Sequence, residues 1–171
     1  MDRGLRAFNA LRSPEAALSA CCAAPGWAAT VASGRPYADR DAVRAAGAAA
    51  LASASWADVA AALADHPRIG AVPRGDDRRS AWSRSEQRAA AGGTAELAAA
   101  NEAYERRFGH VFLLCAAGRT RDEVLAALRD RLDNDPATER RVVRAELAAI
   151  AALRLDRLLD ELGAELEGER R

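Results

Sequence analysis

Two short polar motifs, Asp65-His66-Pro67-Arg68-Ile69-Gly70 and Ser83-Arg84-Ser85-Glu86-Gln87, interrupt an otherwise helical pattern and organise the chain around them. Proline disfavours helical backbone for the residue before it, so the helix that precedes the first motif must end close to His66. Residues 69–80 contain two glycines, a proline and a run of charges, which predicts a loop. The second motif then predicts a new helix over residues 83–91. A His, a Ser, a Glu and a Gln are therefore expected on either side of one loop.

Helical periodicity runs through almost all of the remaining sequence, and no stretch alternates as a half-buried strand does. Thr120-x-x-Glu123 has the spacing of a capping box, and Asp135 before Pro136 is typical of a helix start. The last helix is predicted to run from Pro136 to about Leu162. The run Val111–Ala116 is short and apolar, and it fits either a strand or a buried turn of helix.

The length of 171 residues predicts one domain over residues 1–171 with an all-α helical bundle fold. We expect the core to cover about residues 8–162 and residues 163–171 to be frayed. Basic and acidic residues both number 25, and this balance argues against a nucleic-acid partner. No apolar stretch approaches the roughly 18 residues of a membrane span, so no membrane partner is expected.

The three cysteines, Cys21, Cys22 and Cys115, form no C-x-x-C pair, and their number is odd. The simplest interpretation is that they are reduced thiols in a cytoplasmic protein. The first ten residues are too polar for a signal peptide, in agreement with that location. The two histidines lie far apart, so neither they nor the cysteines predict a metal site. A nucleophilic role for Cys115 has no support in the sequence, and a small buried apolar residue is the simpler interpretation.

His66 is the first candidate for chemistry, because imidazole changes charge near neutral pH and is the usual proton donor or acceptor. The structural alternative is a histidine that stabilises the C-terminal end of its own helix. The second candidate is the group Ser83, Glu86 and Gln87. Their setting fits a site for a polar heterocycle at a helix start, while Ser83-x-x-Glu86 alone also fits a plain capping box.

Arg154 lies inside the apolar stripe of the last helix. With about 100° per residue, it falls in the arc occupied by Val143, Leu147, Ile150 and Leu158. A buried guanidinium needs an anionic or carbonyl partner. The functional interpretation is a clamp for a substrate oxygen, and the structural alternatives are a buried ion pair or a head group that reaches past the stripe.

Taken together, these motifs resemble the OHCU decarboxylase family, where OHCU is 2-oxo-4-hydroxy-4-carboxy-5-ureidoimidazoline. The resemblance extends through Asn101-x-x-Tyr104-x-x-Arg107-Phe108-Gly109-x-Val111-Phe112 and covers roughly residues 8–159. Further matches are Trp27, Arg35-Pro36-Tyr37, Arg131-Leu132-x-Asn134, Glu139, Glu146 and Leu153-Arg154-Leu155. Tyr37 stands where the family more often has Phe, and His110 occupies a variable position.

The resemblance implies a carboxy-lyase that converts OHCU into (S)-allantoin, the last step of urate degradation. It implies the all-helical fold of that family, a homodimer, and no metal or organic cofactor. It also implies a catalytic pair, His66 as acid and base with Glu86 as its partner. The substrate contacts that it implies are Pro67, Ser83, Arg84, Ser85, Gln87, the backbone of Phe112, Leu113, Leu114, Cys115 and Ala116, and Arg154.

A function of another class is compatible with the same fold: a non-catalytic helical module that uses its cleft for binding or dimerisation. The two hypotheses differ in what they require of His66, Glu86, Gln87 and Arg154. A binding module has no physical reason to keep all four in their motif settings, so the sequence favours the enzyme.

Overall fold

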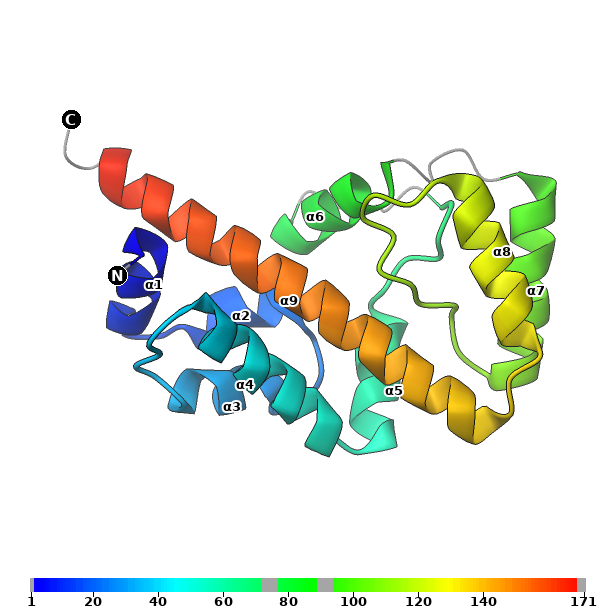
Figure 1. Cartoon of the computed structure of the whole chain (residues 1–171), viewed down its shortest axis with the longest axis horizontal. Coiled ribbons are helices and arrows are strands. Elements are labelled where there is room, and N and C mark those ends of the chain that lie inside the picture. Colours follow the sequence, from blue (N-terminus) through cyan, green and yellow to red (C-terminus); the bar gives the residue numbers. More distant parts are fainter. Residues whose placement is uncertain (1, 72–76, 89–93, 169–171) are drawn as a thin grey trace. The chain divides into compact units, whose positions relative to one another are not determined.

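The helical periodicity of the sequence becomes nine α-helices in the computed structural model, which describes residues 2–71, 77–88 and 94–168 (Figure 1). No strand forms within these ranges. The predicted all-α class is therefore confirmed. The helices are α1 (Arg3–Ala10), α2 (Glu15–Cys21), α3 (Trp27–Ser33), α4 (Arg40–Ser53), α5 (Trp56–Ala64), α6 (Arg78–Glu86), α7 (Ala95–Phe108), α8 (Arg121–Leu132) and α9 (Pro136–Gly168).

The chain divides into two compact units. The first contains the residues up to Asp58 together with those from Ala148 onward, and the second runs from Val59 to Leu147. Helix α9, orange to red in Figure 1, is 33 residues long and contributes turns to both units. The single domain expected for residues 1–171 stays a prediction.

The first unit packs α1 directly against α9. A Cβ atom added to Gly4 would lie 1.9 Å from the carbonyl oxygen of Leu159, so only glycine permits this close approach. On α4, Arg44 Nη1 pairs with Asp156 at 2.6 Å and Arg40 Nη2 with Asp160 at 2.7 Å, which ties α4 to α9. The core of this unit contains apolar side chains that are at most 1% exposed: Leu5, Phe8, Val31, Val43, Leu51, Leu155, Leu158 and Leu159.

The second unit contains a cluster of buried apolar residues between α7, α8 and the segments that flank them. Ile69 comes from the loop after α5, and Phe112 and Leu114 come from the segment between α7 and α8. Both segments therefore contribute to the core although neither is helical. The helical members of the cluster are Leu97, Tyr104, Val124, Leu125 and Leu128.

A charged network is buried next to this cluster. Arg131 of α8 pairs with Glu139 of α9 at 2.6 Å, and the exposed fractions of the two side chains are 9% and 0%. The Tyr104 hydroxyl donates to the same carboxylate, and Asn134 Nδ2 donates to its other oxygen at 2.7 Å. Burial by itself raises the pKa of Glu139, but the hydrogen bonds from Arg131, Tyr104 and Asn134 outweigh it and lower the pKa. The pKa of the Tyr104 hydroxyl is raised, first by burial and then by its bond to Glu139.

Three elements differ from the sequence-based expectation. Helix α6 begins at Arg78 and not at Ser83, because Asp77 Oδ1 accepts the Ser80 N–H at 3.0 Å and caps the helix there. It also ends at Glu86, with Gln87 as its C-cap, so it does not continue to Ala91 as expected; Ala91 itself lies outside the described residues. Helix α9 continues past Leu162 to Gly168, so part of the tail expected to be frayed is helical. Residues 111–116 form neither helix nor strand.

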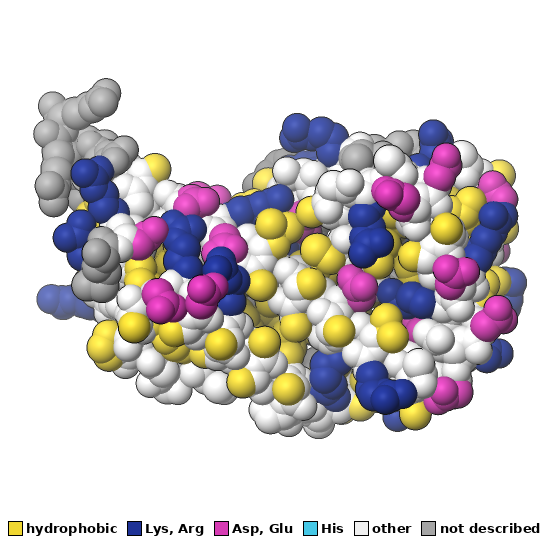
Figure 2. All heavy atoms as spheres, in the orientation of Figure 1, with side chains coloured by type: hydrophobic (Ala, Val, Ile, Leu, Met, Phe, Trp, Pro, Cys, Tyr) yellow, Lys and Arg dark blue, Asp and Glu magenta, His cyan; other side chains and the backbone are white. Residues whose placement is uncertain are grey.

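Figure 2 shows acidic and basic side chains interspersed over the viewed face. Within the described ranges, no single helix has the length and hydropathy of a membrane span. Helices α4 and α5 reach that composition only when they are taken together across the bend between them.

Replacing Glu139 by alanine is expected to lower the free energy of unfolding by about 3–5 kcal/mol, because it leaves the buried Arg131 guanidinium without its carboxylate. Glu96→Ala removes an ion pair with Arg129 in which both side chains are 57% exposed, and it is expected to cost less than about 1 kcal/mol. Chemical denaturation at neutral pH measures the free energy of unfolding of both variants and of the parent chain. Equal losses would contradict the assigned role of the buried pair.

The same pair predicts a pH dependence. Because the pKa of Glu139 is lower in the folded protein than its ordinary value of 4.5, the carboxylate stabilises the fold above that value. The stabilisation is lost as the pH falls through the folded-state pKa. The difference in unfolding free energy between the parent chain and Glu139→Ala should therefore shrink in acid.

Candidate active site

His66 lies just after α5, where the chain leaves the helix in front of Pro67. Its N–H donates to the Leu63 carbonyl at 3.0 Å, and its ring Nδ1 lies 2.9 Å from the Ala62 carbonyl oxygen. A carbonyl oxygen only accepts, so Nδ1 carries the hydrogen and Nε2 is the ring atom that can exchange a proton. The structural alternative is thus partly correct, since the ring does bond its own helix. That bond also fixes the tautomer that acid–base chemistry needs.

A pocket of about 210 Å³ opens at His66. Its walls come from the end of α5 and from one face of α6. Asp65 and Arg79 form an ion pair at 2.8 Å beside the histidine. The lining residues are Ala64, Asp65, His66, Pro67, Arg79, Ser80 and Ser83. The structure therefore brings together His66, Pro67 and Ser83, which were predicted to share a site.

Helix α6 presents its polar residues to the interior from its last turns, not from its first turn. Ser83 and Glu86 are 3% and 8% exposed, and Gln87 follows as the C-cap. Positions i, i+3 and i+4 share a helical face, so the three side chains lie on one side of α6. The predicted capping box at Ser83-x-x-Glu86 is wrong, and so is the placement of this group at a helix start, because α6 begins earlier, at Arg78. Arg84 and Ser85 lie on its exposed faces.

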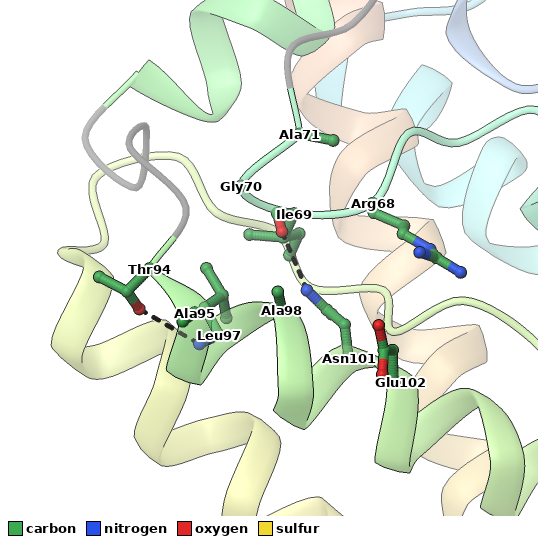
Figure 3. Close-up of a pocket in the computed structure, with 10 residues that line it drawn as sticks. All are labelled: Arg68, Ile69, Gly70, Ala71, Thr94, Ala95, Leu97, Ala98, Asn101 and Glu102. Carbon is green, nitrogen blue, oxygen red and sulfur yellow. Dashed lines mark hydrogen bonds between the residues drawn. The ribbon is translucent and has the colours of Figure 1, made fainter.

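Side chains of α6 and α7 hold the loop that follows His66. Gln87 Oε1 accepts the Gly70 N–H at 3.3 Å, and Asn101 Nδ2 donates to the Ile69 carbonyl at 3.1 Å. Figure 3 shows Asn101 reaching from α7 toward Ile69. Gly70 has a φ of 88°, a left-handed conformation that favours glycine. The first motif is therefore fixed at its end by the second motif and by α7.

A larger hollow of about 360 Å³ lies on the α7 side of this loop (Figure 3). Its residues come from the loop at Arg68–Ala71 and from the first turns of α7. His66 does not line it, and Glu86 lines neither this hollow nor the smaller pocket. We place the candidate site in the smaller pocket, because a titratable side chain with a defined tautomer lies there.

The segment Phe112–Ala116 is largely buried, and Cys115 is its only half-buried residue. Burial raises the pKa of the Cys115 thiol, and the negative charges of Glu146 and Glu86 raise it further. Glu86 of α6 is therefore near this segment. A raised thiol pKa disfavours the thiolate, which argues against Cys115 as a nucleophile.

Arg154 is 1% exposed in α9, so its predicted position within the buried stripe is confirmed. The residues of the same helical face are also buried: Val143, Leu147, Ile150 and Leu158. Arg154 belongs to the first unit, whereas the other candidate residues belong to the second. Its contact with substrate stays a prediction.

Comparison with known proteins identifies the family. Residues 10–156 match the family model described as OHCU decarboxylase. The chain belongs to the OHCU decarboxylase family. A 2-oxo-4-hydroxy-4-carboxy-5-ureidoimidazoline decarboxylase of Amia calva is 33% identical over 141 residues, which cover 79% of this chain and 81% of that protein. The uric acid degradation bifunctional protein TTL of Arabidopsis thaliana is 30% identical over 148 residues, 82% of this chain, and the match spans 46% of that longer protein.

Solved structures agree with the OHCU decarboxylase assignment. The crystal structure of OHCU decarboxylase in the presence of (S)-allantoin matches with a TM-score of 0.69 and 27% identity, over 83% of this chain and 96% of that one. The crystal structure of (S)-allantoin synthase matches with a TM-score of 0.67 over 90% of this chain and 53% of that one. At 20% identity, the second likeness supports the fold alone. The resemblance to the OHCU decarboxylase family and its helical fold is confirmed.

The site residues predicted from the sequence did not include four residues that line this pocket: Ala64, Asp65, Arg79 and Ser80. Arg79 and Ser80 belong to α6. They were assigned to the loop because α6 was expected to begin at Ser83. The usable signal was Asp77-x-x-Ser80, in which the Asp77 carboxylate accepts the backbone N–H of the residue three positions later and caps the helix. Arg79, Ser83 and Glu86 then follow the spacing of one helical face.

No cluster of three or more histidine, cysteine, aspartate or glutamate side chains among the described residues has the arrangement of a metal site. The expectation that the OHCU decarboxylase family fold works here without metal or organic cofactor stays a prediction.

Proposed function

We propose that this chain decarboxylates OHCU to (S)-allantoin. The observation that carries the proposal is the pocket at His66, where a histidine with a fixed Nδ1–H lies beside Ser83 in a member of the OHCU decarboxylase family. The decarboxylase of Amia calva, with 81% of its length matched, supports the same substrate.

The chemistry suits these residues. OHCU carries a carboxylate and a hydroxyl on one carbon, next to a conjugated C=N bond. When the bond to CO₂ breaks, its electron pair enters that conjugated system, so neither a metal nor a Schiff base is required. The protein must orient the carboxylate, exclude water and deliver a proton to one face of the resulting intermediate.

The proton step is assigned to His66 Nε2, because Nδ1 is engaged by the Ala62 carbonyl. Glu86, which is 8% exposed, is assigned as its partner because the family resemblance implies that pair. Delivery of the proton to one face yields one enantiomer, whereas the spontaneous reaction yields a racemate. Stereocontrol is therefore part of the proposed activity.

Substrate contacts are assigned to Pro67, Ser83, Gln87 and the backbone of Phe112–Ala116, with Arg154 holding a polar group of the substrate. The family resemblance supports this set, and the burial of Ser83 and Arg154 is compatible with it. The Arg84 and Ser85 side chains lie on exposed faces of α6, so their contacts stay predictions from the resemblance. A homodimer and a cytoplasmic location belong to the same proposal.

His66→Ala is expected to lower kcat by about 10² to 10⁴-fold, the usual contribution of a general acid–base group. The fold should persist, because His66 follows the last turn of α5 and does not belong to the apolar core cluster. His110→Ala is the matched control, and it should retain near-parental kcat. Steady-state kinetics and thermal unfolding test both variants. A folded His66→Ala protein with parental kcat would refute the role.

Arg154→Met is expected to lower kcat/KM steeply, because the substrate loses a charge-assisted donor. If the Arg154 head group faces the substrate cleft, methionine fills much of the same volume and stability should change by less than about 1.5 kcal/mol. Arg157→Met, on the same helix, is the control for loss of one positive charge. A large fall in Tm with unchanged kinetics would make Arg154 a structural residue and remove it from the site.

A further inference from the structure

The backbone of the segment between α7 and α8 is held by side chains of neighbouring helices. Residues 111–116 form neither helix nor strand, yet Phe112, Leu113 and Leu114 are 1%, 4% and 5% exposed. Buried backbone N–H and C=O groups need hydrogen-bond partners. Here charged side chains of neighbouring helices supply two of those partners.

The first anchor is Glu146 of α9. Its Oε2 accepts the backbone N–H of Cys115 at 2.8 Å. A hydrogen bond from an amide to a carboxylate is shorter and stronger than one between neutral groups. Glu146 is half-buried, which limits its screening by solvent.

The second anchor is Arg131 of α8. Its Nη1 donates to the Leu113 carbonyl at 2.7 Å, while Nε and Nη2 donate to Glu139 Oε1 at 2.9 and 2.6 Å. The guanidinium carbon lies 4.6 Å from the centre of the Phe112 ring. The Glu139 carboxylate thus fixes the orientation of the Arg131 guanidinium, and the guanidinium in turn holds the Leu113 carbonyl by its third hydrogen bond.

The two anchors act on the two peptide groups that flank Leu114. In a trans peptide the N–H and C=O point in opposite directions, and the cis bond found among the described residues lies elsewhere, at Arg35–Pro36. The Leu114 N–H therefore points away from Arg131, and the Leu114 carbonyl points away from Glu146. A bond made at one end of a peptide group also strengthens the hydrogen bond made at its other end.

We propose that Glu146 and Arg131 are positioning residues, which hold the Leu114 N–H and carbonyl as an oriented donor and acceptor pair for the substrate. A ureido or amide group, which offers one N–H and one carbonyl, complements such a pair. The proposal rests on the proposed function, in which substrate contacts the backbone of Phe112–Ala116. It adds two residues that act through this backbone and do not touch the reacting atoms.

Glu146→Leu and Glu146→Gln separate the hydrogen bond from the charge. Both remove the negative charge, but only glutamine keeps an oxygen that accepts the Cys115 N–H. We expect Glu146→Leu to lower kcat/KM about tenfold to a hundredfold, the scale of a small misplacement of a substrate-binding group. Glu146→Gln should stay within about threefold of the parent. Glu165→Leu, at an exposed position of α9, is the matched control and should leave kcat/KM unchanged.

A readout that needs no substrate follows from Cys115. Trypsin cleaves after Arg107 and Arg119, so residues 108–119 report alkylation of Cys115 by iodoacetamide, and residues 13–40 report Cys21 and Cys22. Both variants remove the Glu146 charge, which helps to raise the thiol pKa in the parent chain, so a difference between the variants reports the hydrogen bond. Release of the backbone should make Cys115 react several-fold faster in Glu146→Leu than in Glu146→Gln. The rates at Cys21 and Cys22 should be unchanged.

Arg131→Lys is the second variant, for use if Glu146→Leu does not fold. It keeps a positive charge beside Glu139 but lacks the second arm that reaches the Leu113 carbonyl. The same loss of kcat/KM and the same rise in Cys115 alkylation are expected.

Parental kcat/KM in a folded Glu146→Leu protein would overturn the positioning role. Equal loss in the leucine and glutamine variants would also overturn it, because the charge would then matter and not the hydrogen bond. If the parent chain itself does not decarboxylate OHCU, the proposed function fails. In that case the alkylation contrast still decides whether Glu146 holds the segment.

Discussion

The buried carboxylate of Glu139 is the group on which much of the second unit depends. It accepts hydrogen bonds from α8 through Arg131, from α7 through Tyr104 and from the α8–α9 connection through Asn134. A fully buried charge is tolerated only when its partners are all in place, so the network fixes the geometry of three elements at once. Through Arg131 it also reaches the Leu113 carbonyl, and it thereby links the packing of helices to the backbone of the candidate site.

Short non-helical segments carry the proposed chemistry, and rigid helices hold each of them. Asn101 of α7 and Gln87 at the end of α6 hold the loop after His66 through the Ile69 carbonyl and the Gly70 N–H. Arg131 and Glu146 hold the segment between α7 and α8 in the same manner. In each case a side chain takes the place that a neighbouring strand would fill in a sheet. An all-helical fold can thus present fixed backbone donors and acceptors to a small ligand.

Much of the fold followed from the sequence, because helical period and capping chemistry are local properties. The capping box at Thr120 and the cap at Asp135 form as predicted, and Arg154 is buried where its helical face placed it. The start of α6 was misplaced because Ser83-x-x-Glu86 and Asp77-x-x-Ser80 both carry capping signals, and only the latter is used. The anchoring of residues 111–116 depends on partners 18 and 31 positions away, which no local pattern encodes. The family resemblance supplied the catalytic assignment that residue spacing alone left open.

The most direct measurement of the central claim generates OHCU in situ from urate and follows both its decay and the circular dichroism of the product. With the chain present, OHCU should disappear faster than it does spontaneously, and the product should show the dichroism of (S)-allantoin. Decay at the spontaneous rate, with a product that shows no dichroism, would contradict the account.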